Sequence, residues 1–403
     1  MELADIPAIL ILVGIVAYAI LAGADFGAPI WAVTARGEES NRLSESGHRS
    51  MAPVWEANHV WLIFVLVICW TAYPEVFGSI FSTLWIPLIL ACLGIIMRAV
   101  GYVAGGVSMS RAFTILAAVA SLLVPFALGT VIGAIVDGRV PPGNAQGDII
   151  TAWLAPVPIA IGLILVASSA YLAAVYLAAD ADRRGEDDLA SAFRTRGLVA
   201  GVIAGLLAAI GLIVLEKNVS AEFFDGLTSG LGLVAVIVSG VAGMLTLIML
   251  WTRRFREARF MAAAAVAAVV AGWGIAQQPE MLPGLTIEQA AASDEVIIGL
   301  LVAVVIGLAI LIPSLYLLYS LVLGGRFDPL SVPAADAAGV EEPLGPASRR
   351  ALGFVLGAAG IGGLMLFVSD SGVTLYLGLA LFLAGTAGGV VLLARSLVRT
   401  PPV

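Results

Sequence analysis

Long uninterrupted apolar stretches constrain this chain more than any other feature of its sequence. A run of about 18 or more apolar residues is what an α-helix needs to cross the hydrocarbon core of a bilayer. Eleven such runs follow one another, near residues 6–33, 54–72, 79–103, 114–136, 151–178, 197–215, 228–251, 258–276, 296–323, 351–368 and 373–394. The sequence therefore predicts an all-α polytopic membrane protein with about eleven transmembrane helices.

The overall composition agrees with this fold class. Hydrophobic residues make up 61% of the chain and charged residues 12%, whereas a soluble protein is about 25% charged. The longest connections between the apolar runs are 34–53, 179–196 and 324–350, so we expect no soluble domain. The net charge of -8 argues against nucleic acid as a partner, since nucleic-acid binding needs basic patches.

Basic residues divide the connections into two sets. Every second connection along the chain belongs to the first set, which holds all but two of the Lys and Arg residues. The remaining two, Arg139 and Lys217, lie in the second set. Cytoplasmic loops carry the excess of Lys and Arg, so the N-terminus is predicted outside and the C-terminus in the cytoplasm. The first set comprises Arg36, Arg42, Arg49, Arg98, Arg111, Arg183, Arg184, Arg194, Arg196, Arg253, Arg254, Arg256, Arg259, Arg326, Arg349, Arg350, Arg395 and Arg399.

Three charged residues fall inside the first three predicted spans, near their cytoplasmic ends. A charge in a span costs about 2.5–3.5 kcal/mol on insertion scales, so it usually has a function. Asp25 lies roughly 13 Å deep at 1.5 Å per residue, Glu56 opens the second helix and Arg98 closes the third. Two carboxylates and one arginine at this depth predict a proton entrance or a buried ion pair, with Arg98 as the counter-ion.

The stretch Ala52-Pro-Val-Trp-Glu-Ala-Asn-His-Val-Trp-Leu-Ile63 concentrates polar groups at the start of an apolar helix. Glu56 and His59 are three residues apart and share a helix face. With Asn58 and water they form a candidate proton relay. The alternative is structural: Glu56 would satisfy its own helix N-terminus, and Trp55 and Trp61 would be interfacial anchors.

A haem site in this chain is not predicted. Six-coordinate haem needs two axial ligands, and the histidine other than His59 is His48, in the basic connection after the first span. No cluster with metal-ligand spacing is present in the sequence either. We therefore expect this chain to bind no metal and no cofactor.

Four stretches resemble subunit II of cytochrome bd-type quinol oxidase. The most specific is residues 52–63, in which an acid follows Trp and precedes Asn-x-Val-Trp-Leu-Ile. The others are Gly23-Ala-Asp-Phe-Gly27, then Gly272-Trp-Gly-Ile-Ala-Gln-Gln-Pro279 with the following Leu-Pro, and Leu318-Tyr-Ser-Leu-Val-Leu-Gly-Gly325. Together they cover residues 1–325 in the order expected for the family.

The resemblance implies a fold and a place in a larger complex. Residues 1–325 would form a nine-helix core of two four-helix bundles plus a peripheral helix. A homologous subunit I would hold two b-type haems, one d-type haem and the quinol site. The complex, in a prokaryotic cell (inner) membrane, would oxidise quinol and reduce dioxygen to water with cytoplasmic protons. A structural quinone or lipid and small accessory subunits are left open.

The resemblance also implies residue roles. Glu56 stands where the family places an acid on a proton path to the d-type haem, and Trp61 where it places an oxygen route. This sequence departs from the common pattern in having Ala22, Ala57 and His59 where an acid, Gly and Gln are frequent, and in having Glu instead of Asp as the motif acid. These departures count against carrying over the family's detailed proton route, and they do not count against the family itself.

Two further segments and two rival functions complete the sequence-based picture. Residues 326–350, rich in Pro, Ala and acids, predict a cytoplasmic connector. Residues 351–403 predict an additional two-helix C-terminal hairpin. A proton-coupled secondary transporter would also need membrane carboxylates, but such proteins have paired helix interruptions, which this sequence lacks. A purely structural membrane subunit would differ only in its response to changes at Asp25 and Glu56.

Overall fold

The computed structural model describes residues 2–104 and 111–323, with residues 377, 380, 381, 384 and 388 in isolation. The chain is all-helical apart from one small hairpin, as predicted. Eight described helices are long and apolar enough to cross a membrane, or nine if one bent pair forms a single span. The predicted count of eleven is not confirmed, because the connector 326–350 and nearly all of the predicted helices 351–368 and 373–394 lie outside the described residues.

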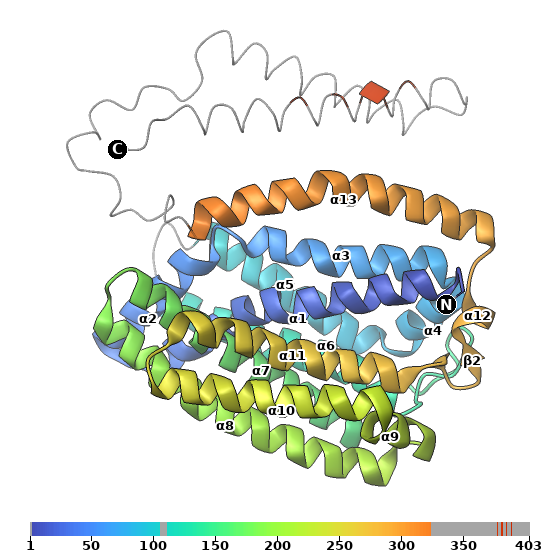
Figure 1. Ribbon diagram of the computed structural model, residues 1–403, viewed down its shortest axis with the longest axis horizontal. Coiled ribbons are helices and arrows are strands. Elements are labelled where there is room, and N and C mark those ends of the chain that lie inside the picture. The colour runs from blue at the N-terminus through green and yellow to red at the C-terminus, as the bar shows by residue number, and fades with distance from the viewer. Residues whose placement is uncertain are drawn as a thin grey trace. The chain divides into compact units, whose positions relative to one another are not determined.

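The elements follow one another along the chain as helices of very different length (Figure 1). They are α1 (Asp5–Thr34), α2 (Gly37–Met51), α3 (Trp55–Ala72), α4 (Pro74–Thr83), α5 (Trp85–Ala104), α6 (Arg111–Val136), α7 (Pro156–Arg183), α8 (Asp187–Asn218), α9 (Ala221–Thr228), α10 (Gly230–Trp251), α11 (Phe255–Gln277), β1 (Glu280–Leu282), β2 (Leu285–Thr286), α12 (Ile287–Ala290) and α13 (Asp294–Leu323).

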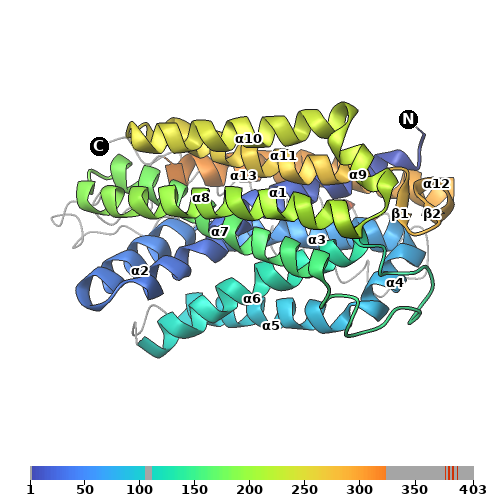
Figure 2. The same ribbon diagram turned by 90° about the horizontal axis from the view of Figure 1, so that it is seen from below.

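Eight of the long described helices pack as two bundles of four. Figure 2 shows α10 at one edge of the described helices and α5 and α6 at the opposite edge. Helices α1, α3, α5 and α6 form the first bundle, and α7, α8, α10 and α11 form the second. Helix α1 also packs along α7 and α11, so it lies at the junction of the two bundles. Both bundles belong to one compact unit, Met1–Ala303, and the second unit is Val304–Val403.

The predicted third span, 79–103, is wrong as a single helix. The chain breaks at Leu84, where α4 and α5 meet at an angle of 84°. Pro87 lies in the first turn of α5, where its missing N–H leaves no intrahelical hydrogen bond unmade, so the sequence suits a new helix start. Helices α4 and α5 are long and apolar enough for a membrane span only together, as one bent pair.

The predicted connection 34–53 contains a helix of its own, α2. Acidic Glu38 and Glu39 occupy its first turn and basic His48 and Arg49 its last, which complements the helix dipole. Leu43, Met51 and the small residues between them are buried against the bundles. Helix α2 therefore lies against the bundles at one end of the molecule rather than extending into solvent.

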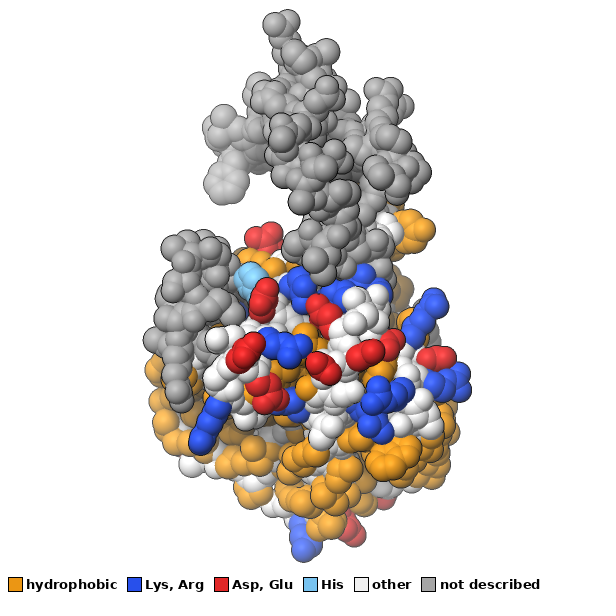
Figure 3. All heavy atoms as spheres, turned by 90° about the vertical axis from the view of Figure 1, so that its left-hand side faces the viewer, with side chains coloured by type: hydrophobic (Ala, Val, Ile, Leu, Met, Phe, Trp, Pro, Cys, Tyr) orange, Lys and Arg blue, Asp and Glu red, His pale blue; other side chains and the backbone are white. Residues whose placement is uncertain are grey.

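Charged side chains gather at the end of the bundles where α2 lies (Figure 3). The α7–α8 and α10–α11 junctions lie at the same end, whereas α4, α9, α12 and the hairpin lie at the opposite end (Figure 1). Most of the basic residues that the sequence assigned to one side are thus brought together in space.

Candidate functional site

A buried ion pair joins α1 to α5. The Asp25 side chain is fully buried, and Nη2 of Arg98 lies 2.7 Å from its Oδ1. The same Nη2 donates to the backbone carbonyl of Asp25. One guanidinium nitrogen therefore binds both the carboxylate and the backbone of the same residue, which fixes the carboxylate in position.

A close helix contact allows α1 to bury this carboxylate. A Cβ at Gly27 would lie 1.9 Å from the carbonyl oxygen of Ser169, so α1 and α7 touch through their backbones there. Residues Ala22 to Ala28 of α1 are all buried as a result. Ala22 itself packs against Val124 with no exposed surface, so the position where the family often has an acid is apolar core here.

Helix α3 contributes two polar side chains to the same region. Asn58 is buried, and its Nδ2 donates to the Leu21 carbonyl of α1 at 3.3 Å, one turn before Asp25. The His59 ring lies among aromatic rings, with centroids 5.9 Å from Tyr18 and 5.6 Å from Phe26. We refer to Asp25, Asn58, His59 and Arg98 as the seam cluster.

The seam cluster contains polar atoms that protein groups leave unsatisfied. Among the described residues, neither ring nitrogen of His59 has a hydrogen-bond partner although both are buried, and the same holds for the Tyr18 hydroxyl. The charges of Asp25 and Arg98 both act on His59. Because buried polar groups are normally paired, these atoms mark a place suited to water or a transferred proton.

Glu56 does not join the seam cluster. It is exposed, and it heads a row of exposed side chains at helical spacing along α3. We call this row the outer face of α3; it comprises Glu56, Val60, Ile63, Val67 and Trp70. The sequence grouped Glu56 with Asp25 and Arg98, whereas the structure turns its side chain away from them.

The two motif tryptophans occupy different environments. Trp55 packs edge-on against His59 with ring centroids 6.1 Å apart, so it closes one side of the histidine. Trp61 packs edge-on against Phe64, and its Nε1 is buried without a hydrogen-bond partner among the described residues. Both rings are thus partly buried.

A cavity of about 310 Å³ runs along α1 through the interior of the first compact unit. Its lining on α1 extends from Ala8 to Phe26, so it reaches the residue after Asp25. Most of the other walls are apolar, and Gln277 and Glu280 line the end opposite α2. Such an apolar cavity excludes water and offers room for an apolar chain or a small apolar molecule.

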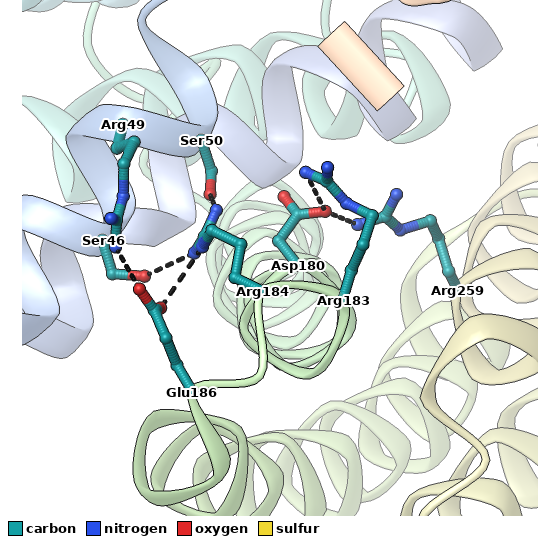
Figure 4. A network of polar contacts seen from close by, with 8 residues as sticks. All are labelled: Ser46, Arg49, Ser50, Asp180, Arg183, Arg184, Glu186 and Arg259. Atoms are coloured by element: carbon teal, nitrogen blue, oxygen red, sulfur yellow. Dashed lines mark hydrogen bonds and ion pairs between the residues drawn. The ribbon is translucent and has the colours of Figure 1, made fainter. Parts of the chain in front are cut away.

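A polar network anchors α2 beside the α7–α8 junction (Figure 4). Arg184 donates to Ser46 and Ser50 of α2 at 3.1 Å each and to Glu186 at 3.2 Å. Arg49 reaches the same carboxylate at 2.7 Å. These hydrogen bonds and ion pairs therefore connect α2 to the α7–α8 junction and hold α2 in one position.

A second part of the network lies between α7 and α11. Asp180 binds Arg259 at 2.5 Å and Arg183 at 3.9 Å (Figure 4). The Asp180–Arg259 pair joins the end of α7 to the start of α11 and links two helices of the second bundle. Arg183 and Asp180 both belong to α7, so their pair lies within one helix.

Two residues near the seam cluster were not selected from the sequence. Tyr18 lies seven residues before Asp25, which is the spacing of one helix face, and this was the available signal. His48 was considered only as a haem ligand in a basic connection. Its place on α2 could not be read before α2 was known to be a helix.

The comparisons with known proteins agree with this architecture. The family model for cytochrome bd terminal oxidase subunit II matches residues 3–322. A protein of Bacillus subtilis (strain 168), provisionally named a cytochrome bd menaquinol oxidase subunit II, is 21% identical over 233 residues, which is 56% of this chain and 67% of that protein.

A solved structure, the bd oxidase from Geobacillus thermodenitrificans, contains a chain of the same fold. The TM-score is 0.67 at 13% sequence identity, covering 81% of this chain and 99% of that chain. The fold, the span of the family match and the motif stretches agree with one another. The chain therefore belongs to the cytochrome bd terminal oxidase subunit II family and is a membrane-spanning subunit of a respiratory oxidase.

Proposed function

We propose that this subunit conducts protons from the cytoplasm to a partner subunit that reduces dioxygen in a cytochrome bd-type quinol oxidase. Reduction of dioxygen to water consumes protons, which must reach the reaction from one side of the membrane only. The observation that carries the proposal is the fully buried Asp25 carboxylate, held by Arg98 on the bundle interior. Burying a charge pair without a functional gain is costly, so its presence in a span points to proton transfer.

The side chains of α3 suggest the next step of the route. His59 contacts the α1 side through Phe26, the neighbour of Asp25, and lies three residues from Glu56 on its own helix. A neutral imidazole accepts a proton on one nitrogen and releases one from the other, so His59 is suited to pass protons outward. Asn58 stabilises this arrangement by its hydrogen bond to α1.

Glu56 is the exit of the proposed route. Its side chain heads the otherwise apolar outer face of α3. A carboxylate on such a face is unfavourable against lipid chains but favourable against a partner that accepts its proton. We therefore assign the outer face of α3 to the contact with the haem-bearing subunit I.

The haems of the complex are assigned to that partner. His59 is a poor candidate for an axial ligand, because the rings of Tyr18, Phe26 and Trp55 enclose it with centroids within 6.1 Å. Subunit I would carry the b-type and d-type haems and the quinol site. The contribution of this chain is to bind that partner and to hold and move protons.

The proposed direction of transfer requires the charged end of the bundles to be cytoplasmic. The gathering of arginines at the α2 end supports this orientation by the positive-inside rule. The N-terminus would then lie outside, and the C-terminus would lie in the cytoplasm. Protons would enter beside α2 and meet Asp25 first.

An oxygen route past Trp61 is a second proposal. Leu62 and Val65, its near neighbours on α3, line the apolar cavity, and dioxygen partitions into such volumes. The same cavity has the length and apolar lining for one chain of a structural quinone or lipid. Replacing Leu62 by Trp to narrow the cavity should raise the oxygen concentration needed for half-maximal turnover, whereas unchanged oxygen dependence would remove this route.

The proton route is tested by Glu56→Ala and Asp25→Asn in the complete oxidase complex. Each should lower quinol-driven oxygen consumption by about tenfold or more, the scale of a lost proton-transfer group. Haem content, read from the visible spectrum, should stay normal in Glu56→Ala. Normal turnover in an intact Glu56→Ala complex would leave Glu56 as a helix cap.

Glu75→Gln is a matched control for these variants. Glu75 is exposed in the first turn of α4, at the end opposite α2, so it lies off the proposed route. Its turnover should equal that of the unmodified complex. If all three variants slowed the complex equally, a general effect on assembly would replace the proton route.

A further inference from the structure

The two histidines of this chain lie near the same ion pair. The charge of Arg98 acts on His48 of α2 and on His59 of α3. The proposed route uses His59 on the way out of the seam cluster. His48, on the side of the charged end, has no role in it.

The packing of α2 places His48 close to the entrance of the seam cluster. A Cβ at Gly47 would lie 3.4 Å from the Cβ of Ala28, so the residue before His48 rests directly on α1. Ala28 is three residues after Asp25 and therefore shares its helix face. Helix α2 at His48 thus covers the end of α1 that carries the buried carboxylate.

The polar network keeps His48 in this place. Arg184 binds Ser46 and Ser50, which lie on either side of His48 in α2 (Figure 4). The surrounding charges have other contacts: Arg49 and Arg184 share Glu186, and Asp180 holds Arg183 and Arg259. The charge of Arg98 on α5 acts on His48, and Arg98 is itself paired with Asp25 on α1.

His48 also has the protonation state that a shuttle needs. Burial, and then the positive charge of Arg98, lower the pKa of His48 from its ordinary value near 6.5. The imidazole is therefore mainly neutral at neutral pH. A neutral ring binds an incoming proton on one nitrogen and gives up the proton on the other, so no charge accumulates beside Arg98.

We propose that His48 collects protons from cytoplasmic water and delivers them to the Asp25–Arg98 pair. The inference rests on the proposed proton route and adds its entry residue. In one transfer, a hydronium ion gives a proton to one ring nitrogen and leaves as water. The N–H bond on the other nitrogen breaks, and its proton passes to the Asp25 carboxylate directly or through water. The ring then returns to its starting tautomer by rotation or by a reverse exchange.

The test uses the assembled oxidase with His48→Ala, and Glu45→Gln as the control. Glu45 is exposed on the same helix and lies off the route. His48→Ala should lower oxygen consumption by about tenfold. Added imidazole should then raise the oxygen consumption of this variant several-fold. Glu45→Gln should have normal turnover and no response to imidazole.

A pH profile gives a second readout that a structural role would not change. In the unmodified complex, turnover should fall as the pH drops through the pKa of His48, which is lowered from its ordinary value, because protonated His48 can no longer accept a proton and its charge adds to that of Arg98. His48→Gln should lack this acid-side inflection. A spectrum with normal haem content and an unchanged melting temperature would establish that the variants are assembled.

The outcomes separate this inference from the proposed function. If Asp25→Asn is slow while His48→Ala is normal, or is slow without imidazole rescue, protons enter elsewhere and the inference fails although the route stands. If Asp25→Asn turns over normally, the route itself fails. Slow turnover in both variants, with rescue confined to His48→Ala, supports both.

Discussion

The seam cluster and the outer face of α3 each carry one carboxylate, and their surroundings differ. Asp25 has no exposed surface and a guanidinium nitrogen 2.7 Å away. Glu56 is exposed and stands among apolar side chains on the outside of its helix. The charge of the first carboxylate is paired within this chain, whereas the second is exposed among the described residues.

The two environments indicate which of the two carboxylates contributes to folding and which acts on a partner. A carboxylate enclosed by its own subunit contributes to folding as well as to any proton transfer, since its charge must be compensated wherever it is buried. A carboxylate on an outer face contributes little to folding and acts on what lies outside. Stability and turnover should therefore respond differently at the two positions.

The largest expected effect is on the seam cluster. Arg98→Ala leaves the Asp25 carboxylate buried without its counter-ion, which should destabilise the subunit by about 3–5 kcal/mol. Thermal unfolding of the complex in detergent measures this loss. Arg256→Ala, at an exposed arginine at the start of α11, is the control and should melt normally.

A double variant sharpens this result. Asp25→Asn combined with Arg98→Ala removes both charges, and it should be more stable than Arg98→Ala alone. Equal melting temperatures for Arg98→Ala and the double variant would mean that the uncompensated charge of Asp25 does not determine the stability of the seam cluster.

The next effect concerns the contact that buries Asp25. Gly27→Ala places a methyl group against the Ser169 carbonyl, and overpacking of this kind costs about 1–3 kcal/mol. Helices α1 and α7 should separate slightly and expose the seam cluster to water, so the melting temperature should fall. Gly240→Ala, where a Cβ on α10 meets open space, should leave the melting temperature unchanged or raise it.

A smaller effect on folding, with a large effect on turnover, is expected at the outer face of α3. Glu56→Gln should leave the melting temperature of the complex within error, because the side chain is exposed in this chain. Quinol-driven oxygen consumption should still fall several-fold. If Glu56→Gln lowered the melting temperature as much as Arg98→Ala does, the proposed difference between the two carboxylates would be wrong, because Glu56 would then contribute to folding.

The smallest expected effect is on the pH dependence of stability. The folded-state pKa of His48 is lowered by burial and by Arg98, so the folded subunit binds fewer protons than the unfolded chain as the pH falls below about 6.5. Stability is therefore retained above that pH and decreases below it. The melting temperature of His48→Gln should decline less between pH 7 and pH 5 than that of the unmodified complex; identical slopes would contradict this.

The sequence predicted the fold class and the buried pair of Asp25 and Arg98, whereas the third predicted interior charge, Glu56, is exposed. Lys and Arg asymmetry placed Asp25 and Arg98 toward one end of adjacent helices, and their ion pair is present at that end. The rotation of α3 was not accessible in the same way. Residues 56 and 59 are about 60° apart on a helix, so one can face inward while the other faces outward, and only packing decides which.

Two other features depended on contacts that are distant in the sequence. Helix α2 is polar for most of its length, and it is ordered by Arg184, more than a hundred residues later in the chain. The break at Leu84 interrupts a continuous apolar run, so hydropathy alone reads α4 and α5 as one span. Local signals, such as Pro87, suggested a helix start but could not set an angle.

The sharp turn at Leu84 has a consequence for the cavity along α1. Because α4 leaves the direction of α5, its Val76, Phe77, Ile80 and Phe81 become part of the cavity wall near the end opposite α2. A straight helix would have carried these side chains past the bundle. The bend therefore lets one short helix supply part of the apolar wall of this cavity, at the end opposite α2.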